Sequence, residues 1–387
     1  MRPACLFALV SFALLSTTTA TAQLPQWSVT FDTGSYADES PLPDLRASWA
    51  PTGDGGHVLA SVDDADAGQV IVRRFNTDGS VRYSRPRNFP GTNVLLAADG
   101  SAGTYVMSSS PATSDMSAFG DLTYLNADGS YGWNQNLSDL VNDTGVATAL
   151  ERLPGGDLLL LRERRLQRLS GQDGTPLWAY ANVTEPFQDA SGLAVAGNTA
   201  WITGRLYPPD NLNGLGFVLQ VDANTGARLG SWLPTCSTCT QGRALGIDAQ
   251  PDGRVVAVGR GGPGEPGFIA FFTADGTPQF VADAPGGGYD RVTHDALGNL
   301  YALSRSTNTV DAINRVDGTV LWSKPGSDMV ATASGVVVSR VFPATTGAIG
   351  VDAFTPAGTL AWSRELETAD GVVAGGARYS GGVTTLL

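Results

Sequence analysis

Short apolar segments separated by polar, glycine-containing turns recur along this chain of 387 residues. In one clear unit the segments are residues 291–294, 300–303, 310–313 and 320–323. Runs of this length, bounded by Gly, Asn and Asp, are typical of β-strands. No helical periodicity is sustained beyond the first 22 residues. The pattern therefore predicts an all-β protein built from groups of four short strands, which we name a to d from the centre outward.

Each predicted group contains the same turn, in which a glycine precedes a strand that carries an aromatic residue. The turn glycines are Gly79, Gly129, Gly174, Gly226, Gly276, Gly318 and Gly358. The aromatic residues that follow them are Tyr83, Trp133, Trp178, Trp232, Phe280, Trp322 and Trp362. The glycines recur every 40 to 52 residues, which is the period of four-stranded propeller blades. We therefore predict a β-propeller whose aromatic residues pack between blades and do not form a series of carbohydrate-binding sites.

Two pieces of sequence remain outside the seven complete units and bear on the number of blades. Residues 26–29 resemble an outer strand d, and residues 371–387 resemble strands a and b of one more unit. Joining these pieces would close the ring and protect its open edges. We therefore predict eight blades, of which the last is incomplete and is closed by the N-terminal strand. Seven blades with a docked hairpin is the alternative.

The first 22 residues have the pattern of a secretory signal peptide. Arg2 supplies a basic start, residues 6–15 form a short apolar core, and residues 20–22 are a small-residue cleavage site. No later run reaches the roughly 18 apolar residues that a membrane-spanning helix needs. We expect residues 23–387 to form one soluble propeller domain that is exported to the periplasm or the extracellular space.

The formal net charge of −13 restricts the partners that the chain can have. A strongly acidic protein is repelled by nucleic acid and by anionic membrane surfaces, so we expect neither as a partner. The acidic residues are scattered and many lie in predicted turns, so the charge does not predict a concentrated cation site. We expect a monomer.

The turn motif resembles the quinoprotein-like (pyrroloquinoline-quinone-type) propeller repeat of exported bacterial proteins. The motif is clearest in residues 173–178 and 317–322, which read Asp-Gly-Thr-Pro-Leu-Trp and Asp-Gly-Thr-Val-Leu-Trp. The quinone enzymes of that family place a disulfide of adjacent cysteines over the cofactor, with a catalytic Asp and calcium ligands. Here no two cysteines are adjacent, and no Asp or calcium position can be matched. The resemblance therefore implies the fold and export, without a cofactor.

Two cysteines follow the predicted signal peptide, in the motif Cys236-Ser-Thr-Cys239. Such a pair can form a small disulfide, a redox dithiol or half of a zinc site. The flanking sequence predicts a loop and no helix N-terminus to lower a thiol pKa, and a zinc site would need two further ligands. In an oxidising compartment we favour a disulfide that staples the loop.

Histidine chemistry is limited to His57 and His294, the two histidines of the chain. His294 precedes Asp295, so these two residues could form half of an acid–base pair. A strand end beside a tight turn is the simpler interpretation. Neither a nucleophile elbow nor a His-Glu-x-x-His motif occurs in the mature chain. The sequence therefore predicts no catalytic residues.

Two charged segments have a functional and a structural interpretation. Asp63, Asp64 and Asp66 precede Gly68 with the alternating carboxylates of cation-binding loops, but a solvated hairpin is the favoured interpretation. The basic segment 162–168, Arg-Glu-Arg-Arg-Leu-Gln-Arg, spans a tight link between two predicted strands, and its Arg and Leu residues predict one exposed strand face. We therefore predict no metal site and no nucleic-acid site from these segments.

We interpret the chain as a non-catalytic exported propeller that binds an unknown protein or envelope polymer. The alternative is an enzyme, either a degenerate quinoprotein oxidoreductase or a glycan-acting propeller. Because strands alternate in direction, the long b–c and d–a connections share one face of the ring, and function usually lies in such loops. The residues that we expect to contact the partner are Tyr207, Asn211, Asn213 and Glu265.

Overall fold

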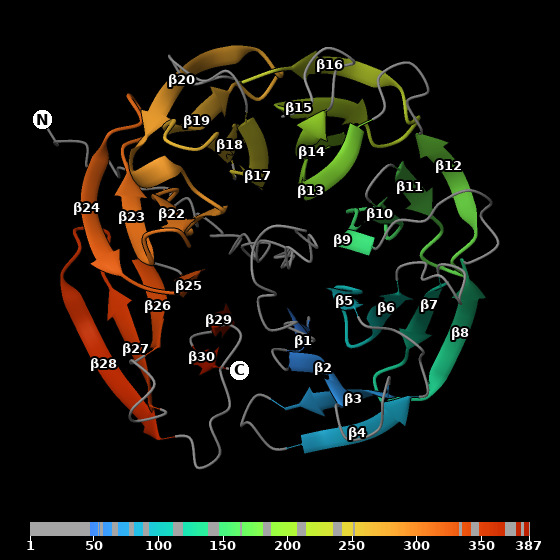
Figure 1. Cartoon of the computed structure of the whole chain (residues 1–387). Helices are drawn as coiled ribbons and strands as arrows, with labels where there is room; N and C mark the ends of the chain where they lie inside the picture. Colours follow the sequence, from blue (N-terminus) through green and yellow to red (C-terminus); the bar gives the residue numbers. More distant parts are fainter. Residues whose placement is uncertain are drawn as a thin grey trace, which may run out of the picture.

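The computed structural model is a ring of small antiparallel sheets (Figure 1). It describes residues 47–52, 54, 57–63, 69–76, 81–87, 93–110, 119–137, 147–162, 165–180, 187–206, 214–234, 242–250, 252–332, 335–341, 348–367, 377–380 and 383–386. Seven sheets have four strands, and one has two. Within this part of the chain the one helical segment is a short 3-10 turn, Pro285–Gly287, and no helix is long and apolar enough to cross a membrane. The predicted all-β propeller architecture is confirmed.

The seven four-stranded sheets follow one another along the chain, and we call them blades one to seven. Blades one to three contain β1 (Ala47–Pro51), β2 (His57–Asp63), β3 (Gln69–Phe75), β4 (Val81–Arg87); β5 (Asn93–Ala98), β6 (Thr104–Ser110), β7 (Phe119–Leu125), β8 (Tyr131–Asn136); and β9 (Ala147–Arg152), β10 (Leu158–Arg162), β11 (Arg165–Leu169), β12 (Pro176–Tyr180). Blades four and five contain β13 (Phe187–Ala196), β14 (Thr199–Leu206), β15 (Leu215–Asp222), β16 (Arg228–Trp232); and β17 (Gly242–Ala249), β18 (Val255–Gly261), β19 (Gly267–Phe272), β20 (Pro278–Ala284). Blades six and seven contain β21 (Arg291–His294), β22 (Leu300–Ser304), β23 (Thr309–Ile313), β24 (Val320–Pro325); and β25 (Asp328–Thr332), β26 (Gly335–Val341), β27 (Ala348–Phe354), β28 (Leu360–Glu367).

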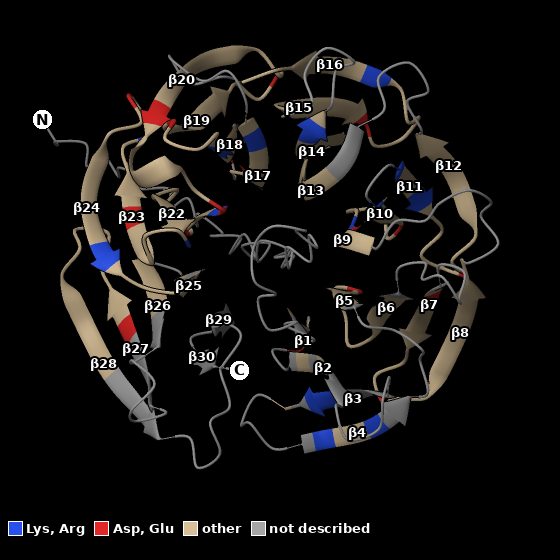
Figure 2. Ribbon diagram, viewed as in Figure 1, with Lys and Arg blue, Asp and Glu red and all other residues tan. Residues whose placement is uncertain are grey.

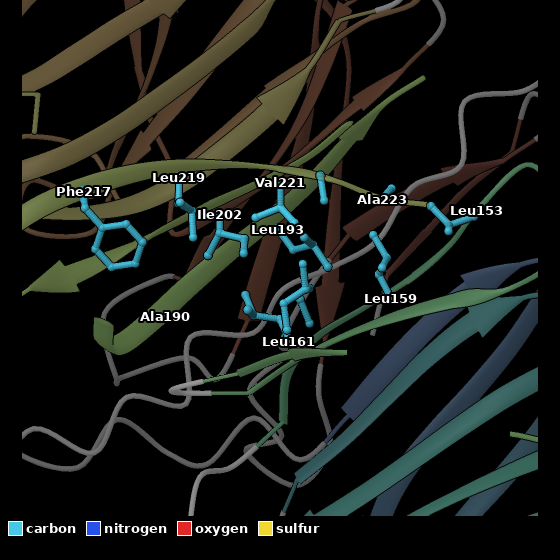
Figure 3. Close-up of a cluster of buried hydrophobic side chains, with 13 residues drawn as sticks. Leu153, Leu159, Leu161, Ala190, Leu193, Ile202, Phe217, Leu219, Val221 and Ala223 are labelled. Carbon is cyan, nitrogen blue, oxygen red and sulfur yellow. The ribbon is translucent and has the colours of Figure 1, made fainter. Parts of the chain in front are cut away.

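The hydrophobic core is divided among the spaces between neighbouring blades. Between blades three and four, Leu159 and Leu161 of β10 pack with Ile202 of β14 and Leu219 of β15 (Figure 3). The alternate residues of β10, such as Leu160, pack on the other side with blade two. Strands b and c are therefore apolar on both faces because each sheet is covered on both sides. This explains the unbroken apolar runs in the sequence.

The repeated aromatic residues join each blade to the next. A Cβ atom added at Gly174 would lie 2.6 Å from the ring of Trp133, and one at Gly358 would lie 2.8 Å from the ring of Trp322. The indole Nε1 of Trp322 also donates a hydrogen bond of 2.8 Å to the carbonyl of Pro356. The glycine of each of these turns lets the ring of the preceding blade lie directly against the turn backbone. The prediction that these residues pack between blades is confirmed for six of the seven, and the exception is Trp362, which is 40% exposed.

Blade four departs from this pattern, as its longer spacing in the sequence suggests. Gly230 occupies the strand position of the usual aromatic residue, and its Cβ would lie 2.5 Å from the ring of Trp232. The ring of Trp232 therefore lies over Gly230 and stacks with Trp201 at 5.8 Å between ring centroids. Gln220 takes the place against the next turn glycine, Gly276. The shift of two residues keeps the indole in the space between blades.

The two-stranded sheet consists of β29 (Ala377–Ser380) and β30 (Val383–Leu386). β29 contacts β25 and β26, and the pair lies between blades seven and one in the ring (Figure 1). This is the place that strands a and b of an eighth unit would take. Residues 26–29, the predicted closing strand, lie outside the described residues, and so does the predicted signal peptide.

Candidate functional site

Strand direction divides the connections of the ring between two faces. The a–b and c–d turns lie on one face, which we call the tight-turn face. The b–c and d–a connections lie on the other, which we call the loop face and which includes residues 262–266, 285–290 and 305–308. The division follows from the antiparallel order of every four-stranded sheet.

Aspartates of the tight-turn face hold the turns in which they lie. The Oδ1 atom of Asp317 accepts hydrogen bonds from the backbone N–H of Thr319, at 3.0 Å, and from its hydroxyl, at 2.7 Å. Asp128 accepts the same two bonds from Ser130. These bonds lower the pKa of both aspartates because they stabilise the charged carboxylate. The side chains that make the repeat motif recognisable are therefore engaged in folding it.

Other carboxylates on the tight-turn face form ion pairs with arginines. Arg74 is buried and donates to Asp54 at 2.6 Å, and Arg168 donates to Asp157 at 2.7 Å. A buried guanidinium that loses its carboxylate would be left without compensation for its desolvation. These pairs therefore hold the a–b turns against strand c.

The prediction that residues 162–168 form an exposed strand face is wrong. Arg162 is 4% exposed, and Leu166 and Gln167 are fully buried. The segment supplies the end of β10 and most of β11, which are the middle strands of blade three and are covered by blades on both sides. Local alternation of Arg and Leu could not reveal this covering, because the covering residues are distant in sequence.

His294 ends β21 and pairs with an acid of the neighbouring blade. The imidazole is 3% exposed, and its Nδ1 lies 2.5 Å from Oδ2 of Asp248 in β17. Burial alone would lower the pKa of His294, but the hydrogen bond and the charge of Asp248 outweigh it and raise that pKa. Asp295 accepts bonds from the backbone N–H groups of Leu297 and Asn299 and so caps the adjacent turn. His294 thus lies at a strand end beside a tight turn, and its acidic partner is Asp248.

The predicted contact residues fall partly within the described structure. Tyr207, Asn211 and Asn213 lie outside the described residues, between β14 and Gly214. Glu265 lies in the b–c connection of blade five, where its Oε2 accepts a hydrogen bond of 2.9 Å from the backbone N–H of Gly262. The backbone N–H of Glu265 returns a bond to the carbonyl of Gly262. Glu265 therefore shapes a compact turn on the loop face.

The predicted disulfide and the Asp-rich segment considered above as a cation-binding loop lie largely outside the described residues. Cys236 and Cys239 both fall in the segment 235–241, and Asp64 and Asp66 fall in the segment 64–68. Across the residues that the structure does describe, no three His, Cys, Asp or Glu side chains are grouped so that they could hold a metal ion.

One charged group on the loop face was missed by the sequence analysis. Arg260, near the end of β18, binds Asp290, with its Nη2 atom 2.7 Å from Oδ1 and 2.8 Å from Oδ2. Asp290 also accepts a hydrogen bond of 2.7 Å from the backbone N–H of Arg305 and is 8% exposed. A recurring pattern in the sequence could have identified Arg260. An arginine follows a Gly or Ser near the end of strand b in several blades, for example as Arg205, Arg260 and Arg305.

A protein-family model described as "Outer membrane protein assembly factor BamB" matches residues 214–380, which extend from β15 to β29 in blades four to seven and the two-stranded sheet. The resemblance to the quinoprotein-like propeller repeat is confirmed. No curated protein matches the sequence.

Solved structures from three organisms share the fold. BamB from Moraxella catarrhalis is 17% identical, with a TM-score of 0.54 over 91% of this chain and 90% of that one. Virginiamycin B lyase from Staphylococcus aureus is 12% identical, with a TM-score of 0.51 over 80% of this chain and 94% of that one. Sqt1 from Saccharomyces cerevisiae is 12% identical, with a TM-score of 0.52 over 82% and 83% of the two chains. At these identities the similarity shows the fold alone.

Proposed function

We propose that this chain is a non-catalytic, exported propeller that binds a protein partner through its loop face. The observation that carries the proposal is the different use of charged groups on the two faces. The tight-turn aspartates Asp128 and Asp317 are engaged in their own turns, whereas the loop face carries the longest connections. The family name, an outer membrane protein assembly factor, supports a protein of the cell envelope as the partner.

The proposal includes the finer features that the sequence predicts. Residues 1–22 are the signal peptide, residues 23–387 form one domain, and Cys236 is bonded to Cys239 on the loop face. The contact region includes Tyr207, Asn211, Asn213 and Glu265. A non-catalytic role is supported by the engagement of His294 with Asp248 and of Asp295 with its own turn.

Site-specific cross-linking tests the use of the loop face. A photoreactive residue at Pro263, exposed on the loop face, should form an adduct with an envelope protein in living cells. The same residue at Leu297, which is 69% exposed on the tight-turn face, is the matched control and should form none. Adducts from position 297 alone would place the partner on the tight-turn face. Absorbance of bound pyrroloquinoline quinone after addition of the quinone and calcium would favour an enzyme instead.

Ring closure is part of the proposal because a binding face requires a rigid scaffold. In an eight-bladed ring, residues 26–29 complete the sheet of β29 and β30. Trp362 in β28 is 40% exposed, whereas Tyr83 at the matching position of blade one is 7% exposed, which is the difference expected if a further blade packs against blade seven in the closed ring. Deletion of residues 23–32 should lower the melting temperature far more than an ordinary terminal truncation. An unchanged melting temperature would contradict closure by this strand.

The disulfide is tested by mass measurement of the mature protein after alkylation under non-reducing conditions. We expect no alkylated thiol, because Cys236 and Cys239 are the cysteines that remain after removal of residues 1–22. Two alkylated cysteines, or one bound zinc ion per chain, would contradict the disulfide.

A further inference from the structure

Trp362 is the one aromatic residue of the repeat that is exposed, and it faces the position of the eighth unit. Ala353 of β27 lies directly opposite Trp362, as Ala312 of β23 lies opposite Trp322 in blade six. Ala312 and Trp322 both pack against blade seven. Because the blades repeat, Ala353 and Trp362 face the space that follows blade seven.

The cover over this side of blade seven ends before its outer strand. β29 contacts β25 and β26, and Val337 of β26 is 1% exposed. Ala353 of β27 is 7% exposed, whereas Trp362 of β28 is 40% exposed. The ring of Trp362 thus lies on a surface that is continuous with a buried contact between blades. In the other blades this outer position is covered by the c–d turn of the next blade.

The pieces assigned to blade eight account for three of its four strands. β29 and β30 take the positions of strands a and b, and residues 26–29 resemble strand d. Neither piece supplies strand c or the glycine turn that follows it. In six units the turn glycine precedes the aromatic residue by four positions, and the same spacing before Trp27 falls on Gln23. The predicted closing strand therefore brings no glycine turn to Trp362.

The contact between blade seven and Trp322 shows what could cover Trp362. The turn glycine Gly358 lies against the ring of Trp322, and the carbonyl of Pro356 accepts a hydrogen bond of 2.8 Å from the indole N–H. Trp362 has a similar sequence context, because residues 361–364 read Ala-Trp-Ser-Arg and residues 321–324 read Leu-Trp-Ser-Lys.

The charge of the outer strand also restricts what could cover Trp362. Residues 360–363 of β28 include no Lys, Arg, Asp or Glu, whereas the outer strand β4 of blade one carries arginines (Figure 2). A charged segment would find no opposite charge among these four residues. The surface therefore suits an uncharged, extended segment that ends in a glycine turn.

We propose that an extended segment of the protein partner takes the place of strand c in blade eight and lays a glycine turn on Trp362. This inference rests on the eight-bladed ring of the proposed function and adds a second contact of the same partner, at the rim of the ring. Within the described residues β30 pairs with β29 alone, which leaves main-chain groups for an added strand. The indole then selects a glycine at the turn, because a side chain there would meet the ring.

A second copy of this chain is a poor donor of that segment. In each of the seven complete blades, strand c is a middle strand that pairs with strands b and d. A copy that donated strand c would have to break one of its own sheets. A separate protein with a free extended segment has no such cost.

Titration of a fluorescent peptide of residues 348–359 with the purified chain, measured by anisotropy, tests the site. The peptide contains β27 and the Gly358 turn, which covers Trp322 in the ring. We expect Trp362→Ala to weaken binding by about tenfold or more, because a central aromatic residue dominates such contacts. Trp362→Phe should weaken it less. Leu177→Ala shortens an exposed side chain on the outer strand β12 and should leave the affinity nearly unchanged.

A change in the peptide gives a second comparison that does not depend on the folding of a protein variant. Gly358→Val in the peptide should weaken binding, because a Cβ at this glycine would lie 2.8 Å from the indole of Trp322 in the native contact. Absence of peptide binding would overturn the proposal, and so would an equal loss in Trp362→Ala and Leu177→Ala. Equal affinity of the two peptides would also overturn it. A dimer of the purified chain that dissociates in Trp362→Ala would assign the place to a second copy.

Cross-linking from Pro263 separates this inference from the proposed function. A Pro263 adduct without any binding of the peptide contradicts the rim contact alone. Binding of the peptide without any Pro263 adduct contradicts the use of the loop face and supports the rim contact.

Discussion

On the tight-turn face, Asp128 and Asp317 accept hydrogen bonds from the turns in which they lie, whereas on the loop face Asp290 joins two blades and lies among arginines. The first arrangement recurs with the repeat because every blade needs the same turn. The second occurs where Arg243 and Arg260 lie opposite each other, and the repeat does not require it. In a repeat protein, charged residues that recur with the repeat therefore stabilise the scaffold, whereas charged residues outside the repeat are better candidates for binding.

The largest expected difference in stability between the two faces concerns one glycine on each face. Gly358 on the tight-turn face and Gly264 on the loop face have nearly equal φ angles of 77° and 78°. A Cβ at Gly358 would lie 2.8 Å from the ring of Trp322, whereas one at Gly264 would meet nothing within 4 Å. Gly358→Ala should therefore lower the free energy of unfolding by about 3 kcal/mol, through strain and overpacking together.

Gly264→Ala is the matched control, because it introduces the backbone strain without the clash. It should lower the free energy of unfolding by about 1 kcal/mol. Chemical denaturation of both variants provides the measurement. If both variants lose the same free energy of unfolding, packing of Trp322 against the turn adds no stability. The tight-turn face would then not differ from the loop face in its sensitivity to this substitution.

The His294–Asp248 pair predicts a pH dependence of stability that originates between blades five and six. Because Asp248 raises the pKa of His294 in the folded chain, protonation of His294 favours folding. This stabilisation is complete below the ordinary histidine pKa of about 6.5 and is lost as the pH rises through the raised value. The melting temperature should therefore fall as the pH rises above about 6.5.

His294→Gln tests the origin of that pH dependence. The variant should melt at a lower temperature at pH 6 and should lose much of the decrease on going to pH 9. Cross-linking from Pro263 should be unaffected, because the pair lies at the tight-turn face of the ring. If His294→Gln melts with an unchanged pH dependence, another group is responsible.

The smallest expected change in stability concerns Asp317, which lies in an exposed turn of blade six. Asp317→Ala removes the acceptor of two hydrogen bonds from Thr319 and should lower the melting temperature slightly. Asp317→Asn keeps an acceptor and should lower it less. Neither change should affect cross-linking from Pro263. A loss of the Pro263 adduct in Asp317→Ala without a change in stability would assign a recognition role to the tight-turn face.

Much of the fold could be predicted from the sequence because its determinants are local. Turn residues such as Gly174 and Asp317, the short apolar runs and the 40 to 52 residue period together predict four-stranded blades. The aromatic residues other than Trp362 were also assigned correctly to packing between blades, since their regular recurrence requires a common environment. The candidate site was predicted only in outline, as the face that carries the long connections.

The sequence by itself determined the repeat, the order of the strands and the face on which the long connections lie, because each depends on residues close together in the chain. Only the tertiary structure decided which charges meet. Asp248 and His294 are 46 residues apart, and Arg260 and Asp290 are 30 residues apart. Such contacts depend on the packing of neighbouring blades and on the strand register, which local patterns of hydrophobic and polar residues do not specify. The same packing buries Arg162 in a segment whose alternation predicted exposure.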